Sequence, residues 1–424
     1  MNGRKLHIAI AGAGPAGLAV ALYLKRDGHR VTVLERFDEP KPLGSGLILQ
    51  PTGLTVLDDL GLLDEILHLG SRIDRLHGTD AESGRTVLDV RYDARSGGRF
   101  GVAVHRATLF GVLYGAARRE GIDIATGIDL VAVETGETPL LRDGSGRAYG
   151  SFDLVVDATG ARSNLRGSAG LTDQPRPLEY GAFWASLDWR ATGFQEHALS
   201  QRYRRASVMI GVLPIGRAEP DGRGMAAFFW SLKPAAAERV REEGLEAWKA
   251  RVASLWPECS AYLDQITDFD QLTLARYGQH TLRHPAARGF AVIGDAAHST
   301  SPQLGQGANM ALLDAAALAH ALRRHGTLDA ALAAYVRSRR AHVRLFQALS
   351  HAFTPFYQSD SVLLPLLRDR LVATVAKVPP APQILASIVA GTLVDPFGPI
   401  GLREAPWQDR LRPAAETIAS VPVG

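Results

Sequence analysis

Three glycines near the start of the chain have the spacing of a phosphate-binding turn. Gly12, Gly14 and Gly17 follow an apolar stretch, Lys5–Ala11, that predicts a buried parallel strand, and they open a predicted helix over Leu18–Asp27. The first glycine permits a tight turn, the second lets the backbone approach a pyrophosphate, and the third allows the helix to pack closely on the strand. Free N–H groups at the start of such a helix bind phosphate oxygens. The pattern therefore predicts a site for an adenine dinucleotide.

An acidic residue at the end of the next predicted strand narrows the choice of nucleotide. The strand covers Arg30–Leu34, and Glu35 follows it directly. A carboxylate there can accept hydrogen bonds from both hydroxyls of an adenosine ribose and would repel a 2′-phosphate, which favours FAD or NAD over NADP. Pro15 and Ala16 lie inside the glycine turn and are predicted to contact the same nucleotide.

A second segment with glycines, much later in the chain, favours FAD over NAD. Asp295 follows a predicted buried strand over Arg288–Ile293. An aspartate at a strand end can hold the ribityl hydroxyls of a flavin. The dipole of the next helix would point at the flavin N1/C2=O edge and stabilise an anionic reduced flavin. The loop and first helical turn supply the other residues predicted here: Pro302, Gly305, Gly307, Ala308 and Asn309.

The elements between these motifs must bring both to one cofactor. Apolar spacing predicts helices over Pro51–Leu63 and Arg106–Glu120, and a buried strand over Asp153–Val156. Aromatic residues and strand-like runs become frequent from Tyr180 to Leu274, and the chain is helical from Met310 onward. The expected division is an FAD-binding domain in three parts, 1–70, 105–178 and 276–345, strands shared with the substrate domain at 71–104, a substrate-binding β-sheet domain at 179–275, and a helical region at 346–424.

Three motifs give this chain a resemblance to a known family. They are GAGPAG with Leu34-Glu35-Arg36, the run His105-Arg106-Ala107-Thr108-Leu109, and GDAAHSTSPQLGQGANMALLDA. Over most of 1–175 and 275–345 the chain resembles the FAD-dependent aromatic hydroxylases of the p-hydroxybenzoate hydroxylase type, the class A flavoprotein monooxygenases. The resemblance implies an α/β fold: a Rossmann-like FAD-binding domain with an inserted, mainly β substrate domain and a helical C-terminal region.

The resemblance also implies which residues hold FAD. Glu35 would bind the adenosine ribose, and Arg36 and the backbone of Val131 would lie near the adenine. The remaining implied contacts are Arg106 with the phosphates or ribityl chain, Asp295 with the ribityl chain, and Gly305 to Asn309 along the isoalloxazine.

For the reaction, the resemblance implies that NADH or NADPH, bound transiently at the surface, reduces FAD. O₂ then adds at flavin C4a, and the C4a-hydroperoxide transfers one oxygen atom to the substrate. Because that species is an electrophile, we expect an electron-rich phenol, hydroxy-heteroaromatic or amine. No catalytic residue is predicted. The candidates for the substrate pocket are Tyr203, Met209, Phe229 and Trp230, and the arginines around Tyr203 would either bind an anionic group or form a solvated strand edge.

One motif departs from the family pattern. Where the family carries Ala-Asp-Gly, this chain has Thr159 at the Asp position and Asp157 two residues earlier. The variant is closer to flavin-dependent halogenases and to reductases of the geranylgeranyl-reductase type, so both stay open as alternative functions, as does a non-catalytic FAD carrier. The Trp-x-Trp-x-Ile-Pro motif of tryptophan halogenases is absent from the sequence.

Composition excludes several other classes. The chain has 424 residues, of which 46% are hydrophobic and 21% charged, and Lys+Arg 47 nearly balances Asp+Glu 44, so a nucleic-acid partner is not expected. One cysteine, Cys259, excludes a disulfide framework, a cysteine zinc site and an iron–sulfur cluster, and we expect no metal and a cytoplasmic location. Ile384–Leu402 contains an aspartate and two prolines, which predicts a buried helix and loop rather than a membrane span. The segment 346–424 is expected to cover the pocket or to contact a partner in a homodimer.

Overall fold

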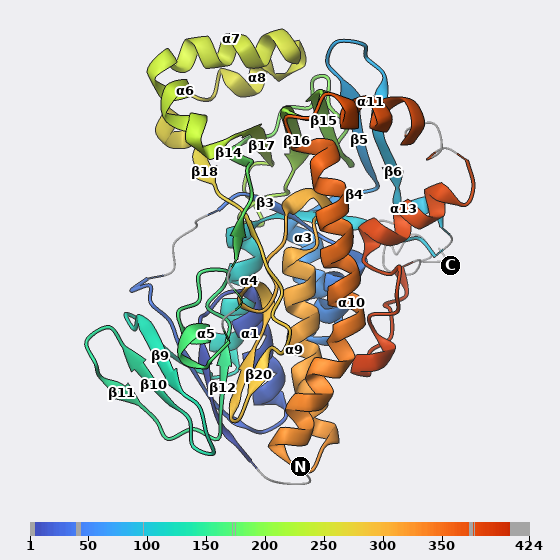
Figure 1. Ribbon diagram of the computed structural model, residues 1–424. Coiled ribbons are helices and arrows are strands. Elements are labelled where there is room, and N and C mark those ends of the chain that lie inside the picture. Colours follow the sequence, from blue (N-terminus) through green and yellow to red (C-terminus); the bar gives the residue numbers. More distant parts are fainter. Residues whose placement is uncertain are drawn as a thin grey trace, which may run out of the picture.

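A six-stranded, mainly parallel sheet organises the lower half of the molecule in the computed structural model (Figure 1). The structure describes residues 5–39, 44–95, 97–171, 173, 175–372, 376 and 378–407. All neighbouring strands are parallel except β20 and β21. The strands are, in spatial order, β20 (Ala286–Ala287), β21 (Phe290–Val292), β12 (Leu154–Asp157), β1 (His7–Ala11), β2 (Arg30–Leu34) and β8 (Asp123–Ala125). Because β1 and β21 are parallel and separated by one strand, the two glycine motifs leave the same edge of the sheet.

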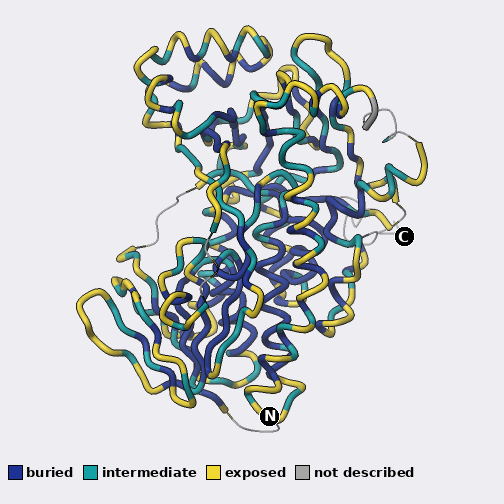
Figure 2. The backbone as a smooth tube through the Cα atoms, in the orientation of Figure 1, coloured by how far each residue is buried: buried dark blue, intermediate teal, exposed yellow. Residues whose placement is uncertain are grey.

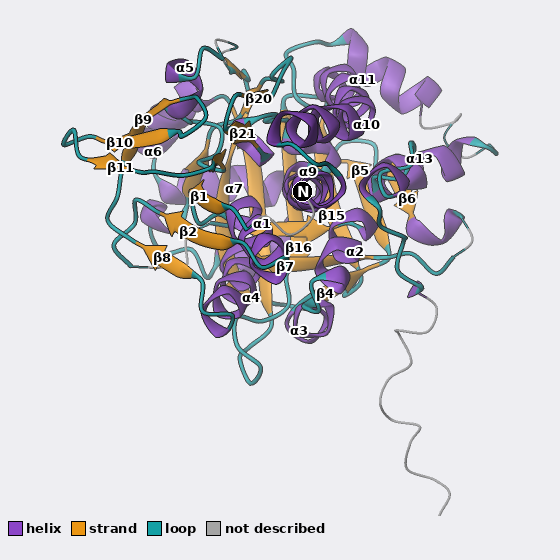
Figure 3. Cartoon of the chain, turned by 90° about the horizontal axis from the view of Figure 1, so that it is seen from below, coloured by secondary structure: helices purple, strands orange, loops and turns teal. Residues whose placement is uncertain are grey.

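Helices cover one face of this sheet, and a small sheet covers the other (Figure 3). Ile10 and Val156 share a core with the helices α1 (Pro15–Arg26), α4 (Arg106–Arg119) and α9 (Gly307–Arg324). Ala11 and Val155 face the other way and pack with Leu141 of the antiparallel sheet. That sheet has the order β11 (Ala148–Tyr149), β10 (Leu140–Asp143) and β9 (Leu130–Glu134).

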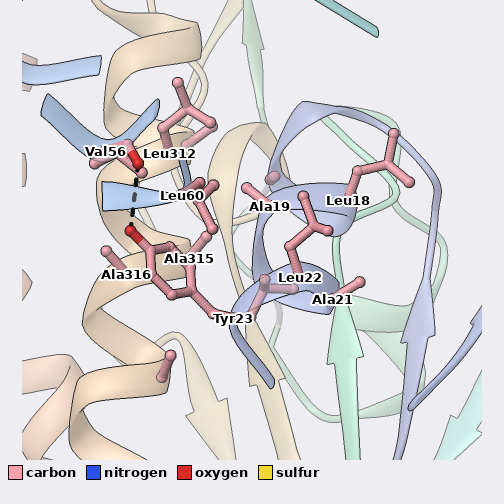
Figure 4. Close-up of a cluster of buried hydrophobic side chains, with 14 of the residues drawn as sticks. Leu18, Ala19, Ala21, Leu22, Tyr23, Val56, Leu60, Leu312, Ala315 and Ala316 are labelled. Carbon is pink, nitrogen blue, oxygen red and sulfur yellow. Dashed lines mark hydrogen bonds between the residues drawn. The ribbon is translucent and has the colours of Figure 1, made fainter. Parts of the chain in front are cut away.

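A buried cluster holds α1, α9 and α2 (Pro51–Asp59) together (Figure 4). Leu18 and Leu22 of α1 belong to it together with Leu312 of α9. The Tyr23 hydroxyl, on the same helix as the leucines, donates a hydrogen bond to the backbone carbonyl of Val56 at 3.4 Å. The helices that begin in the two glycine motifs are therefore joined through one core, which fixes the relative positions of their N-termini.

A seven-stranded sheet forms the upper half of the molecule (Figure 1). Its neighbours are antiparallel except β15 and β5. The order is β18 (Thr273–Ala275), β14 (Gly181–Asp188), β17 (Met225–Leu232), β16 (Val208–Pro214), β15 (Ala198–Arg204), β5 (Arg75–Asp80) and β6 (Thr86–Arg91). The strands β5 and β6 come from 71–104, so that segment contributes to the sheet built mainly from 179–275.

Three helices that the sequence analysis did not predict cover the outer face of the upper sheet. They are α6 (Ala237–Glu243), α7 (Leu245–Leu255) and α8 (Ser260–Leu263), and their outward side is exposed (Figure 2). Trp248 and Val252 of α7 are completely buried against the sheet. A sheet with apolar side chains on both faces needs a cover on each, and these helices provide one of the two.

The remaining elements connect the two halves, and the C-terminal helices α11 (Leu363–Leu367) and α13 (Ala381–Ala390) lie on the right-hand side of Figure 1. A three-stranded antiparallel sheet has the order β3 (Gly46–Leu49), β7 (Gly101–His105) and β4 (Ser71–Ile73), and α3 (Leu63–Leu69) follows α2. Short elements are α5 (Leu165–Ser168) and the pair β13 (Arg176–Pro177) with β19 (Gly278–Gln279). The C-terminal helices are α10 (Leu328–Tyr357), α11 and α13.

The predicted fold class is confirmed: a Rossmann-like domain carries an inserted, mainly β domain and a helical C-terminal region. The stretch Ile384–Leu402 holds the end of α13 followed by turns, and the expected helix at 346–424 is described as far as 407. In the described part of the chain, no helix combines the length and apolar character needed to cross a bilayer. The division into domains stays a prediction.

Candidate active site

The first glycine turn is shaped by contacts that leave no room for a Cβ atom. Gly12 has φ +100°, and a Cβ on it would lie 2.6 Å from the carbonyl oxygen of Ala158. A Cβ on Gly17 would lie 1.9 Å from the carbonyl oxygen of Gly12. Gly14, at the N-cap of α1, has nothing within 4 Å of its Cβ position, and no side chain caps the helix. Two glycines therefore build the turn, and the third leaves open space in front of the helix N-terminus, as a bound pyrophosphate requires.

A cavity of about 220 Å³ opens beside this turn. Glu35 and Arg36 line it, as the prediction for an adenosine site requires. The Glu35 carboxylate accepts hydrogen bonds from the backbone N–H groups of Ala13, at 2.6 Å, and Arg36, at 2.8 Å. Oε1 also accepts from the Phe37 N–H group, at 3.3 Å, whereas Oε2 accepts from Ala13 alone. These contacts orient the carboxylate and leave Oε2 able to accept a further bond from a ribose. Val131 does not line this cavity, although its neighbour Leu130 does.

Arg162 also lines this cavity, and the sequence analysis did not select it. It follows β12 in the loop after Asp157, so only the fold brings it near Glu35.

The Asp157 carboxylate accepts hydrogen bonds from the Thr159 hydroxyl at 2.6 Å and from the Ser163 hydroxyl at 2.5 Å. The unusual Asp-Ala-Thr-Gly motif thus forms a closed turn with a buried carboxylate, whose pKa is raised by burial.

A second cavity, of about 350 Å³, lies between the seven-stranded sheet and the segment from Asp295 to the start of α9. At its lower end Asp295 stands beside the start of α9, where a Cβ on Gly307 would lie 3.7 Å from Asp295 Oδ1. No described residue hydrogen-bonds the Asp295 carboxylate, and burial raises its pKa while the charge of Arg106 opposes that shift. A half-buried carboxylate without donors is costly, and the hydroxyls of a ribityl chain are donors of the right kind. The site therefore fits the flavin end of FAD.

Several predicted residues frame this lower end. Arg106 lines the cavity from the start of α4, which the His105 side chain caps by accepting a hydrogen bond from the Ala107 N–H group at 3.1 Å. Pro302, Gly305, Gly307 and Ala308 line it from the loop and first turn of α9.

Asn309 has another role. Its side chain is fully buried, accepts a hydrogen bond from the Gln50 N–H group at 2.8 Å, and donates to the carbonyls of Ile48, at 3.1 Å, and Gly305, at 2.8 Å. It does not line the cavity. The amide of Asn309 therefore ties the Gly305 turn to β3, and contact of this residue with the isoalloxazine stays a prediction.

A buried charge cluster anchors the Asp295 turn from behind. Asp314 accepts a hydrogen bond from the Gly294 N–H group at 2.9 Å, lies 2.5 Å from His298 Nε2, and accepts from Arg339 Nε at 2.7 Å. Burial alone would raise the pKa of Asp314, but His298 and Arg339 lower it well below its usual range. The cluster joins α9, α10 and the end of β21.

A second buried cluster near the Asp295 turn contains a neutral histidine, His280. His280 contacts the Arg166 guanidinium and lies 2.7 Å from the Ser299 hydroxyl. Burial lowers the pKa of His280 to about 4, with a further contribution from Arg166. The folded pKa is below the unfolded value of about 6.5, so the unfolded state binds more protons between these values.

We therefore expect His280 to make its full contribution to the free energy of unfolding above pH 6.5. As the pH drops toward 4, this contribution should fall by on the order of 1–3 kcal/mol. Urea unfolding of the holoprotein across this range measures the slope. His280→Gln should flatten it, while His68→Gln, at an exposed position, should leave it unchanged. The buried His342, with a pKa lowered to about 3, keeps part of the slope in both variants. An unaltered slope in His280→Gln contradicts the assignment.

The upper wall of the larger cavity is one face of the seven-stranded sheet. Tyr203, Met209 and Phe229, all predicted for the pocket, line it, and Trp184 joins them. The rings of Trp184 and Phe229 lie 4.6 Å apart between centroids. A Cβ on Gly211 would lie 2.1 Å from the Phe229 ring, so a glycine lets this ring lie against the sheet. The wall is therefore aromatic, as expected for a pocket that holds a planar substrate.

Trp230, the fourth candidate, faces the other way and does not line this cavity. It packs with Trp248, at 6.0 Å between ring centroids, in the core under α7. The reason is the alternation of side chains along β17, which places Phe229 and Trp230 on opposite faces. Arg202 also points away from the cavity, with Nη1 2.6 Å from the Thr79 hydroxyl. Arg204 pairs with Glu82 at the surface and Arg205 is exposed, so none of the three arginines beside Tyr203 lines the cavity. The option that they hold an anionic substrate there is therefore corrected.

The C-terminal region lines one side of the cavity. The sequence analysis had left open whether this region covers the pocket or contacts a partner. Tyr357 at the end of α10 lies 5.6 Å from Tyr203 between ring centroids, and Gln306 Nε2 donates to the Val389 carbonyl of α13 at 2.7 Å. The other lining residues from this region are Phe353, Gln358, Leu385 and Ile388. No motif marks these positions, because aliphatic residues in a helix have the same pattern whether they cover a core or a ligand.

Fold and site together define a flavoprotein hydroxylase of the p-hydroxybenzoate hydroxylase type. The family model described as "FAD binding domain" matches residues 5–349, and the chain belongs to this family. It is 28% identical over 353 residues to a putative FAD-dependent monooxygenase, YetM, of Bacillus subtilis (81% of this chain and 92% of the relative). It is 29% identical over 378 residues to 3-hydroxybenzoate 6-hydroxylase 1 of Aquipseudomonas alcaligenes (82% and 89%).

Among solved structures, the tetrameric form of 2-methyl-3-hydroxypyridine-5-carboxylic acid oxygenase matches with a TM-score of 0.77 and 22% identity, covering 95% of this chain and 100% of that one. This likeness supports the fold. With the family match and the named relatives, it identifies the chain as an enzyme of the FAD-dependent monooxygenase class.

Proposed function

We propose that this enzyme consumes NADH or NADPH and O₂ to hydroxylate an electron-rich aromatic or heteroaromatic small molecule. One observation carries the proposal: the flavin-binding end, with Asp295 and the start of α9, and the aromatic wall, with Phe229, belong to the same cavity. When bound, FAD supplies the chemistry, accepting electrons from the nicotinamide and activating O₂. A relative named for 3-hydroxybenzoate supports a phenolic substrate.

The residues of this chain position the reactants. Asp295 would accept hydrogen bonds from the ribityl hydroxyls, and the N-terminus of α9 would stabilise negative charge on the reduced flavin ring. Phe229 and Trp184 would hold a planar substrate against the upper wall, and Tyr357 would keep water from the reacting centre. Positioning and exclusion of water thus account for the catalysis that the protein itself provides.

The test uses the purified holoenzyme and a panel of phenols and hydroxy-heteroaromatics. We expect at least one compound to stimulate NAD(P)H oxidation and to gain one ¹⁸O atom from ¹⁸O₂, as read by mass spectrometry. A product that carries halide, or turnover that consumes no O₂, would instead establish the halogenase or the reductase alternative. Absence of flavin reduction by either nicotinamide would leave a carrier. The use of NADH or NADPH, the cytoplasmic location and the homodimer stay predictions.

A further inference from the structure

The substrate end of the larger cavity has no charged side chain. Among the described residues that line this cavity, Arg106 and Asp295 are the only charged ones. Both belong to the flavin end, where Asp295 lies beside Gly307 and the charge of Arg106 opposes the rise of the Asp295 pKa. A substrate placed against Phe229 would therefore meet aromatic, aliphatic and neutral polar groups.

Two arginines near this end of the cavity, Arg202 and Arg368, form hydrogen bonds with other parts of the chain. Arg202 lies on the opposite face of β15, bonded to Thr79 and 5.3 Å from the ring of Trp256. Arg368 is close to the cavity, because its guanidinium stacks on the ring of Tyr203 at 5.1 Å, yet the residue is only 1% exposed and does not line it. Its donors go to a carboxylate and two backbone carbonyls: Asp369 at 2.6 Å, Phe356 at 2.9 Å and Arg205 at 3.1 Å. Neither arginine lines the cavity or offers it a donor that is free of these contacts.

The polar groups that remain at this end are neutral, and the amide of Gln358 lacks partners among the described residues. Gln358 lines the cavity with 6% of its surface exposed, and neither its amide nitrogen nor its amide oxygen has a hydrogen-bond partner among the described residues. The hydroxyl of Tyr203 has no hydrogen bond within the described part of the chain either. Gln201 makes one contact, from Nε2 to the sulfur of Met209 at 3.4 Å. A buried amide without partners is costly, and a rotation of the Gln358 side chain toward the cavity would let a ligand with a donor next to an acceptor satisfy both amide atoms.

We propose that the substrate is an uncharged planar molecule with a neighbouring hydrogen-bond donor and acceptor, such as an amide, a lactam or a hydroxy-ketone, and that carboxylated aromatics are rejected. This inference rests on the proposed function. A carboxylate at this end loses its hydration and meets no cation among the described residues that line it, a cost that corresponds to an affinity loss of about 100-fold or more.

The experiment compares matched pairs on the oxidised holoenzyme: 3- and 4-hydroxybenzamide against 3- and 4-hydroxybenzoate, and 4-hydroxyquinolin-2-one against its 3-carboxylic acid. Binding is read as a change in the flavin absorption spectrum, without turnover. We expect the neutral member of a pair to bind about 100-fold more tightly. Equal binding within the pairs, tighter binding of the acids, or no binding by any neutral member overturns the proposal.

Variants test the residues. Gln358→Leu should weaken binding of the amides about 10-fold and leave unsubstituted phenol unchanged, because only the amides use the glutamine. Gln201→Leu is a second variant in case the first loses FAD, and Gln195→Leu, at an exposed position, is the control. If phenols stimulate NAD(P)H oxidation but the acids bind as well as the amides, the proposed function stands and this inference fails. If the neutral ligands bind and no compound gains oxygen, the proposed function fails instead.

Discussion

Gly17→Ala is expected to yield a protein that does not retain FAD and unfolds at markedly lower urea concentration than the parent. The new Cβ would lie 1.9 Å from the carbonyl oxygen of Gly12, a contact with backbone that no rotamer change can relieve. The helix α1 would have to move away from β1 and, with it, from the cluster it shares with α9. We expect a loss of about 3 kcal/mol or more in the free energy of unfolding, measured on apoprotein.

Gly14→Ala tests the contact with the pyrophosphate without disturbing the glycine turn itself. Its Cβ would meet no described atom within 4 Å, and the backbone at φ −69° suits alanine. The apoprotein should keep its stability to within about 1 kcal/mol, while FAD affinity falls about 10-fold or more, because the methyl group enters the space of the pyrophosphate.

Gly111→Ala, at an exposed position in α4 with no neighbour within 4 Å, is the matched control. It should leave FAD binding unchanged and stabilise the protein by about 0.5–1 kcal/mol. Equal effects of Gly14→Ala and Gly111→Ala on FAD affinity would show that this turn does not hold the pyrophosphate.

Asp314→Asn should destabilise the holoprotein by about 3–5 kcal/mol, because it leaves the buried guanidinium of Arg339 without its counter-charge. The loss should also weaken FAD binding, since Asp314 accepts the hydrogen bond of Gly294, next to Asp295. Because the folded pKa of Asp314 is depressed, its contribution is present above the unfolded pKa of about 4 and is lost as the pH falls through the folded value. Asn should therefore remove most of the acid sensitivity that this group contributes.

The matched control is Asp93→Asn, which removes a carboxylate paired with Arg91 at the surface, where the side chains are 56% and 66% exposed. Such a pair contributes less than about 1 kcal/mol, so urea midpoints should hardly change. A similar small effect of Asp314→Asn would mean that the cluster does not anchor the Asp295 turn.

The cofactor end of the site was accessible from sequence because it depends on local backbone chemistry. Gly12 and Gly17 sit where a side chain cannot fit, and Asp295 follows a strand directly, so residue type and spacing carry the information. For Asn309 the structure shows a side chain that stabilises the loop and does not line the cavity, so its contact with FAD stays a prediction. Sequence spacing placed it near the flavin but could not show which of its neighbours would use its amide.

The sequence by itself determined the cofactor class and the position of the Asp295 turn, because short-range rules of turns and parallel strands apply wherever the pattern occurs. The fold class followed from the resemblance of its motifs to those of a known family. Only the tertiary structure decided which side of the upper sheet faces the flavin. Phe229 and Trp230 are adjacent in the sequence, both are aromatic, and both are almost fully buried. Which of them lines the cavity depends on the helices at 237–263, which cover one face of the sheet, and on α10 and α13, which enclose the other. That choice is made by packing between segments far apart in the chain, which no local pattern records.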